Sequence, residues 1–411
     1  MGEVSAKPTE GVETQLRQMF ALPPHPVLRT TFPIKGKDQG GSFAITSHPS
    51  VICFWRLAMP RLSPSLDFNR TSEAEMQAID VSPIFGPKSA ARDAADAAIM
   101  AAASGLGFMT ISGFAEPAGI QPNAVKRMLR IFELPEDAKR RLYRQKFAAE
   151  NPNVYHGWFP LSGKGATYKE GIDIGPDLVR PAEATGDDPL LEPTPLPDDS
   201  ALPGWHNAAA SYYQGMERLG AALLRSIARG LDLPEETFTP VFENGISTLR
   251  LIHYPVRPAD NLAEVEEDVF ATHNGKRFAI SGKAHVDSGF VTLLAQDGVE
   301  GLQALNHAGE WIDVPPMPGT LAVNFGKLLD RWTGGRIKAT EHRVLGSGRE
   351  RCSVPFFYEP RVDSLIAPLD GLKAQPFAPF HYGDHLWESM TRFVEFAGME
   401  HLRPPRMKAT A

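Results

Sequence analysis

The pattern of this chain changes at about residue 246, and that change constrains the fold more than any other feature. Beyond it, short apolar runs alternate with turns rich in Gly, Pro and Asp, which is typical of β-strands. The predicted strands cover residues 247–254, 290–296, 301–306, 320–325, 339–345 and 351–358. A run of closely spaced strands predicts a sandwich or jelly roll, because parallel sheets need an intervening helix between their strands.

Helical patterns precede these strands. The predicted helices cover residues 89–104, 121–146 with a new start at Pro135, 205–230, and about 383–399 at the C-terminal end. A short strand is expected at 107–111, and Gly230 is interpreted as a helix C-cap. Residues 176–204 have no period and are interpreted as a long loop. Helices followed by strands predict an α+β, mainly β fold, in which N-terminal helices buttress a jelly-roll core and a helix follows it.

The expected organisation has four parts. Residues 1–75 show no sustained period and form a partly disordered extension, residues 76–240 the N-terminal helical region, residues 241–400 the core, and residues 401–411 a tail. A net charge of -7 argues against a nucleic-acid partner. Two cysteines are too few for a disulfide framework, and no apolar run could span a membrane. We therefore expect a cytoplasmic protein without a membrane partner.

A candidate metal site is suggested by three residues. His285 and Asp287 are two apart, so in an extended chain their side chains share one face. His342 lies in another strand-like run, with 54 residues between it and Asp287, an interval that suits strands returning to the same end of a sandwich. Two histidines and one carboxylate leave coordination positions free, as in non-haem Fe(II) oxygenases. Each residue alone is also compatible with an ordinary structural role.

A candidate carboxylate receptor follows nine residues after His342. Arg351 and Ser353 are two apart, so on a strand they face one side, where a guanidinium fork and a hydroxyl could bind a carboxylate. Tyr254, at the end of a predicted strand, could add a donor. Alone, Arg351 is compatible with a surface ion pair and Tyr254 with an aromatic residue at the edge of the core.

Together these motifs resemble the isopenicillin N synthase-like family of Fe(II)- and 2-oxoglutarate-dependent dioxygenases. The segment from His285 to Leu294 is similar to its H-x-D-x-G-x-x-T-L-L strand, and Arg351-Cys352-Ser353 to its R-x-S motif. Residues 324–344, with Asn324-Phe325-Gly326 and a Trp-Thr-Gly-Gly run, resemble the block between them. Ile252, Lys327 and Gly334 depart from the family pattern, and residues 256–280 look longer than usual.

The resemblance implies a distorted double-stranded β-helix with Fe(II) on His285, Asp287 and His342. It further implies that 2-oxoglutarate chelates the iron while Arg351, Ser353 and Tyr254 bind its far carboxylate. O2 would then convert 2-oxoglutarate to succinate and CO2 as a small organic substrate is hydroxylated, desaturated or cyclised. The alternatives are an Fe(II) oxidase of this fold that does not use 2-oxoglutarate, a non-catalytic binding protein on the scaffold, and a zinc hydrolase.

Five aromatic residues are candidates for the substrate pocket. Three of them, Tyr155, Trp158 and Phe159, precede a Gly-rich stretch, while Phe290 follows the metal motif and Phe357 follows the receptor motif. Core packing is the alternative role for each of them. They suggest a mostly apolar, aromatic small molecule as substrate.

Overall fold

The computed structural model describes residues 76–161, 167–181, 188–263, 267–369, 371–372, 376–393 and 395–406. The predicted extension of residues 1–75 and the end of the predicted tail lie outside these residues. Within them, no helix is both long enough and apolar enough to cross a membrane.

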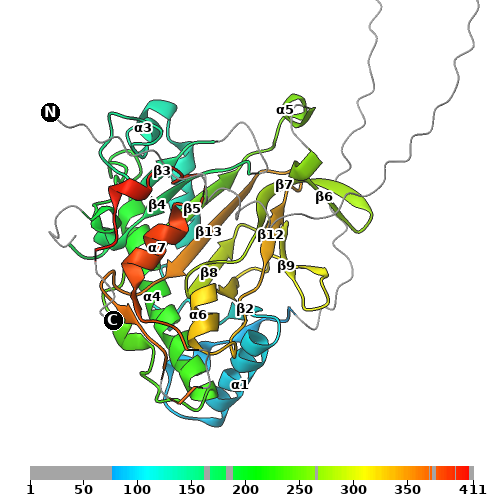
Figure 1. Ribbon diagram of the computed structural model, residues 1–411. Helices are drawn as coiled ribbons and strands as arrows, with labels where there is room; N and C mark the ends of the chain where they lie inside the picture. Colours follow the sequence, from blue (N-terminus) through cyan, green and yellow to red (C-terminus); the bar gives the residue numbers. More distant parts are fainter. Residues whose placement is uncertain are drawn as a thin grey trace, which may run out of the picture. The chain divides into compact units, whose positions relative to one another are not determined.

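Two β-sheets form the centre of the described part of the chain (Figure 1). In spatial order, the eight described strands of the larger sheet are β1 (Ile79–Asp80), β2 (Phe108–Ser112), β11 (Leu321–Phe325), β8 (Val291–Gln296), β13 (Arg351–Tyr358), β5 (Thr248–Tyr254), β4 (Glu170–Ile174) and β3 (Gly157–Phe159). The five described strands of the smaller sheet are β10 (Trp311–Asp313), β9 (Leu302–Leu305), β12 (His342–Leu345), β7 (Lys276–His285) and β6 (Phe270–His273). A short pair, β14 (Leu365–Ile366) and β15 (Phe380–His381), lies apart from both.

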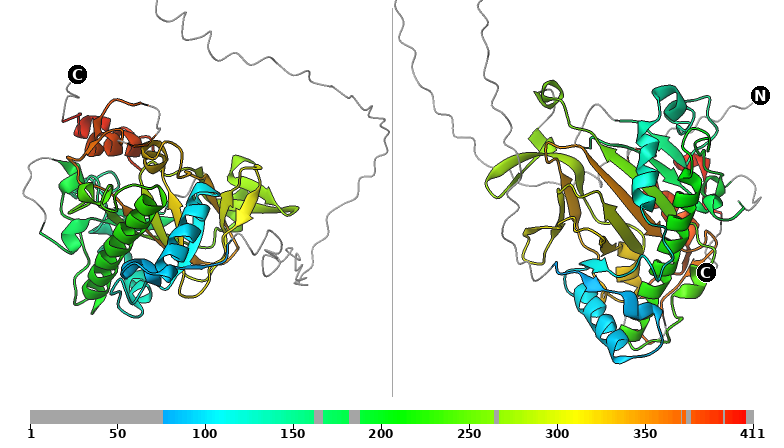
Figure 2. Two further views of the ribbon diagram at one scale, coloured as in Figure 1. Left: turned by 90° about the horizontal axis from the view of Figure 1, so that it is seen from below. Right: turned by 180° about the vertical axis from the view of Figure 1, so that it is seen from behind.

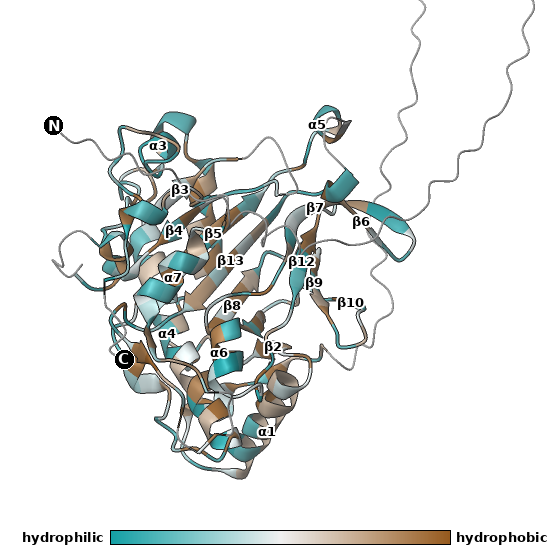
Figure 3. Cartoon of the chain, viewed as in Figure 1, coloured by the Kyte–Doolittle hydropathy of each residue, from teal (hydrophilic) through white to brown (hydrophobic). Residues whose placement is uncertain are grey.

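All these strand pairs are antiparallel except β1 with β2. Strands β1 to β4 come from the predicted helical region, so residues 76–240 contribute directly to the larger sheet. Hydrophobic residues concentrate on β8 and β13, whereas α3 is mostly hydrophilic (Figure 3).

Helices cover one face of the larger sheet. The described α-helices are α1 (Ala90–Ser104), α2 (Ala124–Leu129), α3 (Glu136–Arg140), α4 (Trp205–Gly230), α5 (Ala259–Ala263), α6 (Lys327–Trp332) and α7 (Tyr382–Met390). Helices α1 and α4 pack side by side, and α4 contacts β13 (Figure 2). The ring of Tyr213 on α4 meets Phe356 edge to face at 5.0 Å. Even-numbered residues of β13 therefore face the helices, which leaves its odd-numbered residues facing the other way.

The predicted combination of helices and a β-rich core is confirmed, and the ends of α1 show why it begins and ends there. The Ser89 hydroxyl accepts from the Arg92 backbone N–H at the start, and the Gly105 N–H bonds the Ala101 carbonyl at the end. The prediction for Gly230 was wrong, because this residue is the last of α4 and Leu231 is the cap. A Cβ atom on Gly230 would lie 1.9 Å from Met100 Cγ, so glycine there permits close packing of α1 on α4.

The predicted helix over 121–146 was too long. It is divided into α2, a short 3-10 turn and α3, and it ends at Arg140. Pro135 disfavours helical geometry in the residue before it. Beyond α3, the Arg144 N–H donates to the Trp158 carbonyl at 3.0 Å, so the chain continues as a bridge to β3.

Residues 256–280, which look longer than usual for the family and for which no strand was predicted, contain a hairpin made by β6 and the start of β7. Its turn is Asn274-Gly275, in which both residues have positive φ, 48° and 71°. This dipeptide is the preferred sequence for a two-residue hairpin turn, so the signal was present in the sequence. The C-terminal helix α7 is also shorter than predicted and ends at Met390.

Candidate metal centre

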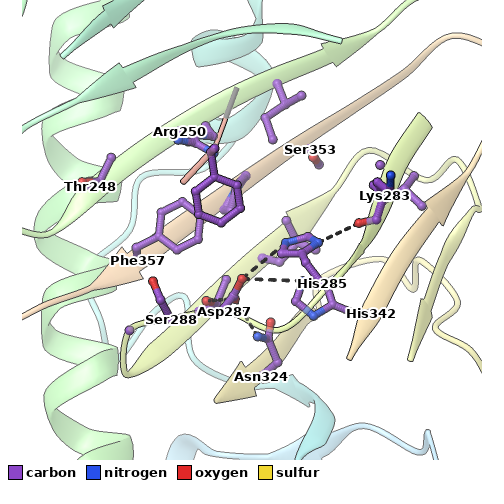
Figure 4. Close-up of a pocket in the computed structure, with 18 of the residues that line it drawn as sticks. Thr248, Arg250, Lys283, His285, Asp287, Ser288, Asn324, His342, Ser353 and Phe357 are labelled. Atoms are coloured by element: carbon purple, nitrogen blue, oxygen red, sulfur yellow. Dashed lines mark hydrogen bonds and ion pairs between the residues drawn. The ribbon is translucent and has the colours of Figure 1, made fainter. Parts of the chain in front are cut away.

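The three candidate ligands converge at one end of the smaller sheet. His285 is the last residue of β7 and is paired directly with His342, the first residue of β12. His285 thus ends a strand, whereas the sequence pattern placed it at the start of one. Asp287 follows in the connection to β8, and ligand atoms of the three residues lie within 4.8 Å of one another. Asp287 Oδ1 is 3.5 Å from His285 Nε2 and 3.8 Å from His342 Nε2 (Figure 4).

Hydrogen bonds orient both imidazoles for metal binding. The Nδ1 atom of His285 lies 2.8 Å from the Lys283 carbonyl oxygen, and that of His342 lies 3.2 Å from the Thr340 carbonyl oxygen. A carbonyl only accepts, so each Nδ1 carries the proton and each Nε2 keeps its lone pair. Both lone pairs are directed to the side where Asp287 Oδ1 lies. Such second contacts of a ligating histidine are typical of metal sites.

Residues of the larger sheet hold the Asp287 side chain in place by hydrogen bonds. Its Oδ2 atom accepts from the Thr292 hydroxyl of β8 at 2.6 Å and from the Asn324 amide of β11 at 2.7 Å, which leaves Oδ1 for a metal. Its backbone carbonyl accepts from the Lys327 N–H at 2.8 Å. A Cβ atom on Gly326 would lie 2.2 Å from the Gly289 carbonyl oxygen, so this close approach requires glycine. The candidate centre therefore joins the two sheets.

The pKa shifts of Asp287 and His342 suit a divalent cation. For His285, burial lowers the pKa but Asp287 raises it more, so a cation would have to displace a proton there. Burial raises the pKa of Asp287, but His342, His285 and the Thr292 hydroxyl together hold it well below its usual range. Burial lowers the pKa of His342 below its usual value, although Asp287 acts in the opposite direction. The carboxylate is then ionised and His342 neutral at neutral pH, as metal ligands must be. Two nitrogens and one oxygen on one side of an ion fit an open-faced Fe(II) site.

We expect the hydrogen bonds to Asp287 to contribute to metal affinity. Asn324→Ala and Thr292→Val should each weaken Fe(II) binding by about 10–100-fold, because they release the carboxylate from its orientation. Competition against a chelator under anaerobic conditions measures this affinity. Thr292→Ser is the matched control, since it retains the hydroxyl and should bind Fe(II) like the unaltered protein. Unchanged affinity in both Asn324→Ala and Thr292→Val would contradict this role.

A cavity of about 560 Å³ opens between the two sheets and includes the candidate centre. On the larger sheet its lining follows a period of two, with Arg351, Ser353, Pro355, Phe357 and Glu359 along β13 and just beyond it, and Thr248, Arg250, Ile252 and Tyr254 along β5. These residues are on the sheet face opposite α4. In Figure 4, Thr248 and Phe357 lie to one side of Asp287 and Ser353 to the other.

Arg351, Ser353 and Tyr254 meet at one end of this sheet face. Arg351 pairs with Tyr254 in the β13–β5 register, and its guanidinium carbon lies 5.1 Å from the Tyr254 ring centroid. Arg351 is 3% exposed; its Nε donates to the Val299 carbonyl and its Nη2 to Gln296 Oε1, both at 3.2 Å. Among the described residues no carboxylate pairs with Arg351, and its buried Nη1 has no hydrogen-bond partner. A buried cation in this state is costly unless a ligand supplies the missing charge.

The five candidate aromatic residues separate into two groups. Tyr155, Phe290 and Phe357 line the cavity. Trp158 and Phe159 are not among its lining residues: Trp158 is fully buried with its ring 5.3 Å from that of Phe132, and Phe159 packs against the guanidinium of Arg144 at 5.3 Å.

Several lining residues were not singled out from the sequence. Thr248, Arg250 and Glu359 line the cavity, as does Asn324, which the sequence marked only as part of a motif. A usable signal was available for the first three. Extending the period of two from Arg351 along its strand reaches Glu359, and extending it back from Tyr254 reaches Arg250 and Thr248.

The sequence profile of the 2OG-Fe(II) oxygenase superfamily matches residues 246–360. The 2-oxoglutarate-Fe(II) type oxidoreductase hxnY of Emericella nidulans is 30% identical over 301 residues, covering 70% of this chain and 80% of the relative. The 2-oxoglutarate-dependent dioxygenase citB of Monascus ruber is 30% identical over 309 residues, covering 72% of this chain and 88% of the relative.

Solved structures show the same fold. A full-length Neurospora crassa protein, crystallised in complex with alpha-KG and thymine, superimposes with a TM-score of 0.64 at 23% identity, covering 78% of this chain and 98% of that one. A dioxygenase for auxin oxidation from rice gives a TM-score of 0.55 at 24% identity, covering 77% of this chain and 95% of that one. The sequence relatives establish the family, and with it Fe(II) as the metal cofactor and 2-oxoglutarate and O2 as co-substrates. The chain belongs to the 2OG-Fe(II) oxygenase superfamily, of which the isopenicillin N synthase-like proteins are part, and it is a 2-oxoglutarate-dependent dioxygenase.

Proposed function

We propose that His285, Asp287 and His342 hold Fe(II), and that Arg351, Ser353 and Tyr254 bind the far carboxylate of 2-oxoglutarate. The observation that carries this proposal is the buried guanidinium of Arg351. It lies in the same cavity as the three ligands and has no carboxylate partner among the described residues. A dicarboxylate that bridges the two sites would supply the missing counter-charge.

The bound iron supplies the redox chemistry that couples conversion of 2-oxoglutarate to succinate and CO2 with oxidation of a substrate by O2. The chain's own residues position the reactants. Thr292 and Asn324 fix the Asp287 carboxylate, and the two backbone carbonyls fix the imidazoles. Arg351 and Ser353 set the direction of 2-oxoglutarate along the larger sheet. The paired sheets support the expected distorted double-stranded β-helix as the fold of this core.

The primary substrate is, in this proposal, a small and mostly apolar or aromatic molecule. Phe290, Phe357 and Tyr155 provide aromatic walls in the cavity. The Neurospora crassa protein, which shares the fold, was solved with thymine, a small planar molecule. Residues 76–240 and 241–400 act together as the catalytic unit. We place the enzyme in the cytoplasm, because two cysteines cannot form a disulfide framework.

A pair of ligands tests the carboxylate receptor without altering the protein. 2-Oxobutyrate keeps the keto acid that would chelate iron but lacks the far carboxylate of 2-oxoglutarate. The Fe(II)-loaded protein should bind 2-oxoglutarate at least about 30-fold more tightly under anaerobic conditions, because only that ligand pairs with Arg351. Equal affinity for both, measured by calorimetry, would refute the assigned receptor.

A further inference from the structure

The cavity continues past the candidate metal centre to a second polar end, away from Arg351. Glu359 lies eight positions after Arg351 on the same side of the chain and is 6% exposed. Its backbone is fixed, since its N–H donates to the Ser247 hydroxyl at 3.1 Å. Its Oε2 atom is buried and has no hydrogen-bond partner by distance and angle among the residues that the structure describes. A buried polar atom without a partner needs an explanation.

A second buried polar atom lies at the same end. Thr248 on β5 pairs with Phe357 on β13. Phe357 is two residues before Glu359 and faces the same side, so Thr248 lies beside the part of the chain that carries Glu359. Thr248 is 3% exposed, lines the cavity, and its Oγ1 has no partner by distance and angle among the described residues. Burial, followed by the nearby Glu359 carboxyl, raises the pKa of Tyr155, which places that phenol beside the same group. Hydroxyls lie near both atoms, since, against the larger effect of burial, Thr248 lowers the pKa of Tyr155 and Tyr382 lowers that of Glu359, but neither pair has hydrogen-bond geometry. Polar atoms with spare hydrogen-bonding capacity beside aromatic walls are typical of a ligand-recognition site.

The surroundings of Glu359 favour its neutral, protonated form at pH 7. Burial raises its pKa to about 8, against the opposing effects of the Tyr382 hydroxyl and the Arg250 charge. Arg250 does not neutralise it by an ion pair, because its Nη2 donates to Asp173 Oδ2 at 2.8 Å and its Nε to the other oxygen of the same carboxylate. A protonated carboxyl offers one O–H donor and one carbonyl acceptor side by side.

The other charged lining residues are matched by opposite charges. Lys283 pairs with Asp268 at 3.8 Å, and Arg392 pairs with Glu388. Burial tends to raise the pKa of Glu395, but the charges of Lys169 and Arg250 lower it. Among the described cavity residues outside the metal centre, Arg351 is the cation that lacks a carboxylate neighbour, and the proposed function already gives it 2-oxoglutarate.

We propose that Glu359 and Thr248 recognise the primary substrate, and that this substrate is an uncharged planar molecule with an N–H donor beside a carbonyl acceptor, as in a lactam or cyclic imide. Such an edge would pair with the carboxyl of Glu359 through two hydrogen bonds, while Phe357, Phe290 and Tyr155 enclose the ring. This inference rests on the proposed function, because it gives the Arg351 end to 2-oxoglutarate and the Glu359 end to the substrate.

The test uses the full chain loaded with Fe(II) and 2-oxoglutarate under anaerobic conditions, with binding measured by calorimetry. The probes are 2-pyridone, which presents the proposed edge, N-methyl-2-pyridone, which lacks the donor, and benzylammonium, which is a cation. The unaltered protein should prefer 2-pyridone over both others. Glu359→Gln preserves a donor and an acceptor and should change 2-pyridone affinity by less than about 3-fold, whereas Glu359→Met should weaken it by about 10–100-fold.

Glu243→Gln, at an exposed position, is the control and should leave all three affinities unchanged. Glu359→Met should keep or raise the thermal midpoint, because it removes an unsatisfied buried group, so lost binding would not reflect unfolding. Equal binding of 2-pyridone and N-methyl-2-pyridone, or preferred binding of benzylammonium that Glu359→Gln abolishes, would overturn the proposal. Affinity for 2-oxoglutarate, measured in the same samples, should be normal in every Glu359 variant. A wrong assignment of the 2-oxoglutarate receptor would therefore be detected separately from a wrong assignment of the substrate site.

Discussion

Asp287→Ala should abolish both iron binding and turnover. Asp287 is the candidate ligand that carries a negative charge. Its Oδ1 atom lies 3.5 Å from His285 Nε2 and 3.8 Å from His342 Nε2. Its removal leaves two histidines, which is too few for the open-faced site. The loss of affinity should exceed the about 10–100-fold expected when a hydrogen-bond partner of a ligand is removed. Metal analysis after anaerobic loading with Fe(II), and succinate formation from 2-oxoglutarate, give the two measurements.

The matched control for this variant is Asp268→Ala. Asp268 is another carboxylate near β7, but its side chain is 60% exposed and its ion pair with Lys283 at 3.8 Å contributes little. This variant should load iron and form succinate like the unaltered protein. Circular dichroism of both variants checks that each remains folded. A folded Asp287→Ala protein that still held one equivalent of Fe(II) would show that the metal binds elsewhere.

The sequence predicted those parts of the fold whose signal is local. Helix α1 has a Ser cap before it and a Gly after it, and β13 has a period of two that the structure retains. The helix predicted to continue past Arg140 depended on a tertiary contact, because the bridge from Arg144 to Trp158 competes with helical hydrogen bonding. The hairpin at Asn274-Gly275 was not predicted, although its local turn signal was present in the sequence.

The candidate metal centre was predictable because its ligands belong to spaced motifs, and the structure explains the long interval between them. His285 and His342 are neighbours in a strand pair, so the 54 residues between Asp287 and His342 form the strands that separate them along the chain. The partners of Asp287 were not predictable from spacing. Thr292 and Asn324 reach its carboxylate only because β8 and β11 are adjacent in the larger sheet. The polar end of the cavity at Glu359 was not predicted, because the period of two was not extended past Tyr358, the last residue of β13.

Arg351→Ala should mainly weaken the binding of 2-oxoglutarate. Truncation removes one partner of a buried charged pair, which costs about 2–5 kcal/mol and corresponds to about 30- to several-thousand-fold in affinity. Because Arg351 is not a metal ligand in the proposed site, Fe(II) loading should remain normal. The preference for 2-oxoglutarate over 2-oxobutyrate should fall sharply in this variant, since only the Ser353 and Tyr254 hydroxyls would then remain to bind the far carboxylate. Anaerobic calorimetry with the two ligands measures this difference.

Two further variants make the result specific to the Arg351 side chain. Arg351→Lys keeps the charge but loses the planar fork, so it should retain part of the preference for 2-oxoglutarate. Arg349→Ala removes an exposed arginine two residues earlier in the chain and should retain all of it. If Arg351→Ala still distinguished 2-oxoglutarate from 2-oxobutyrate as strongly as the unaltered protein, another cation would have to bind the far carboxylate. The unsatisfied Nη1 of Arg351 would then indicate a different anionic ligand, because burying an unpaired guanidinium N–H costs free energy.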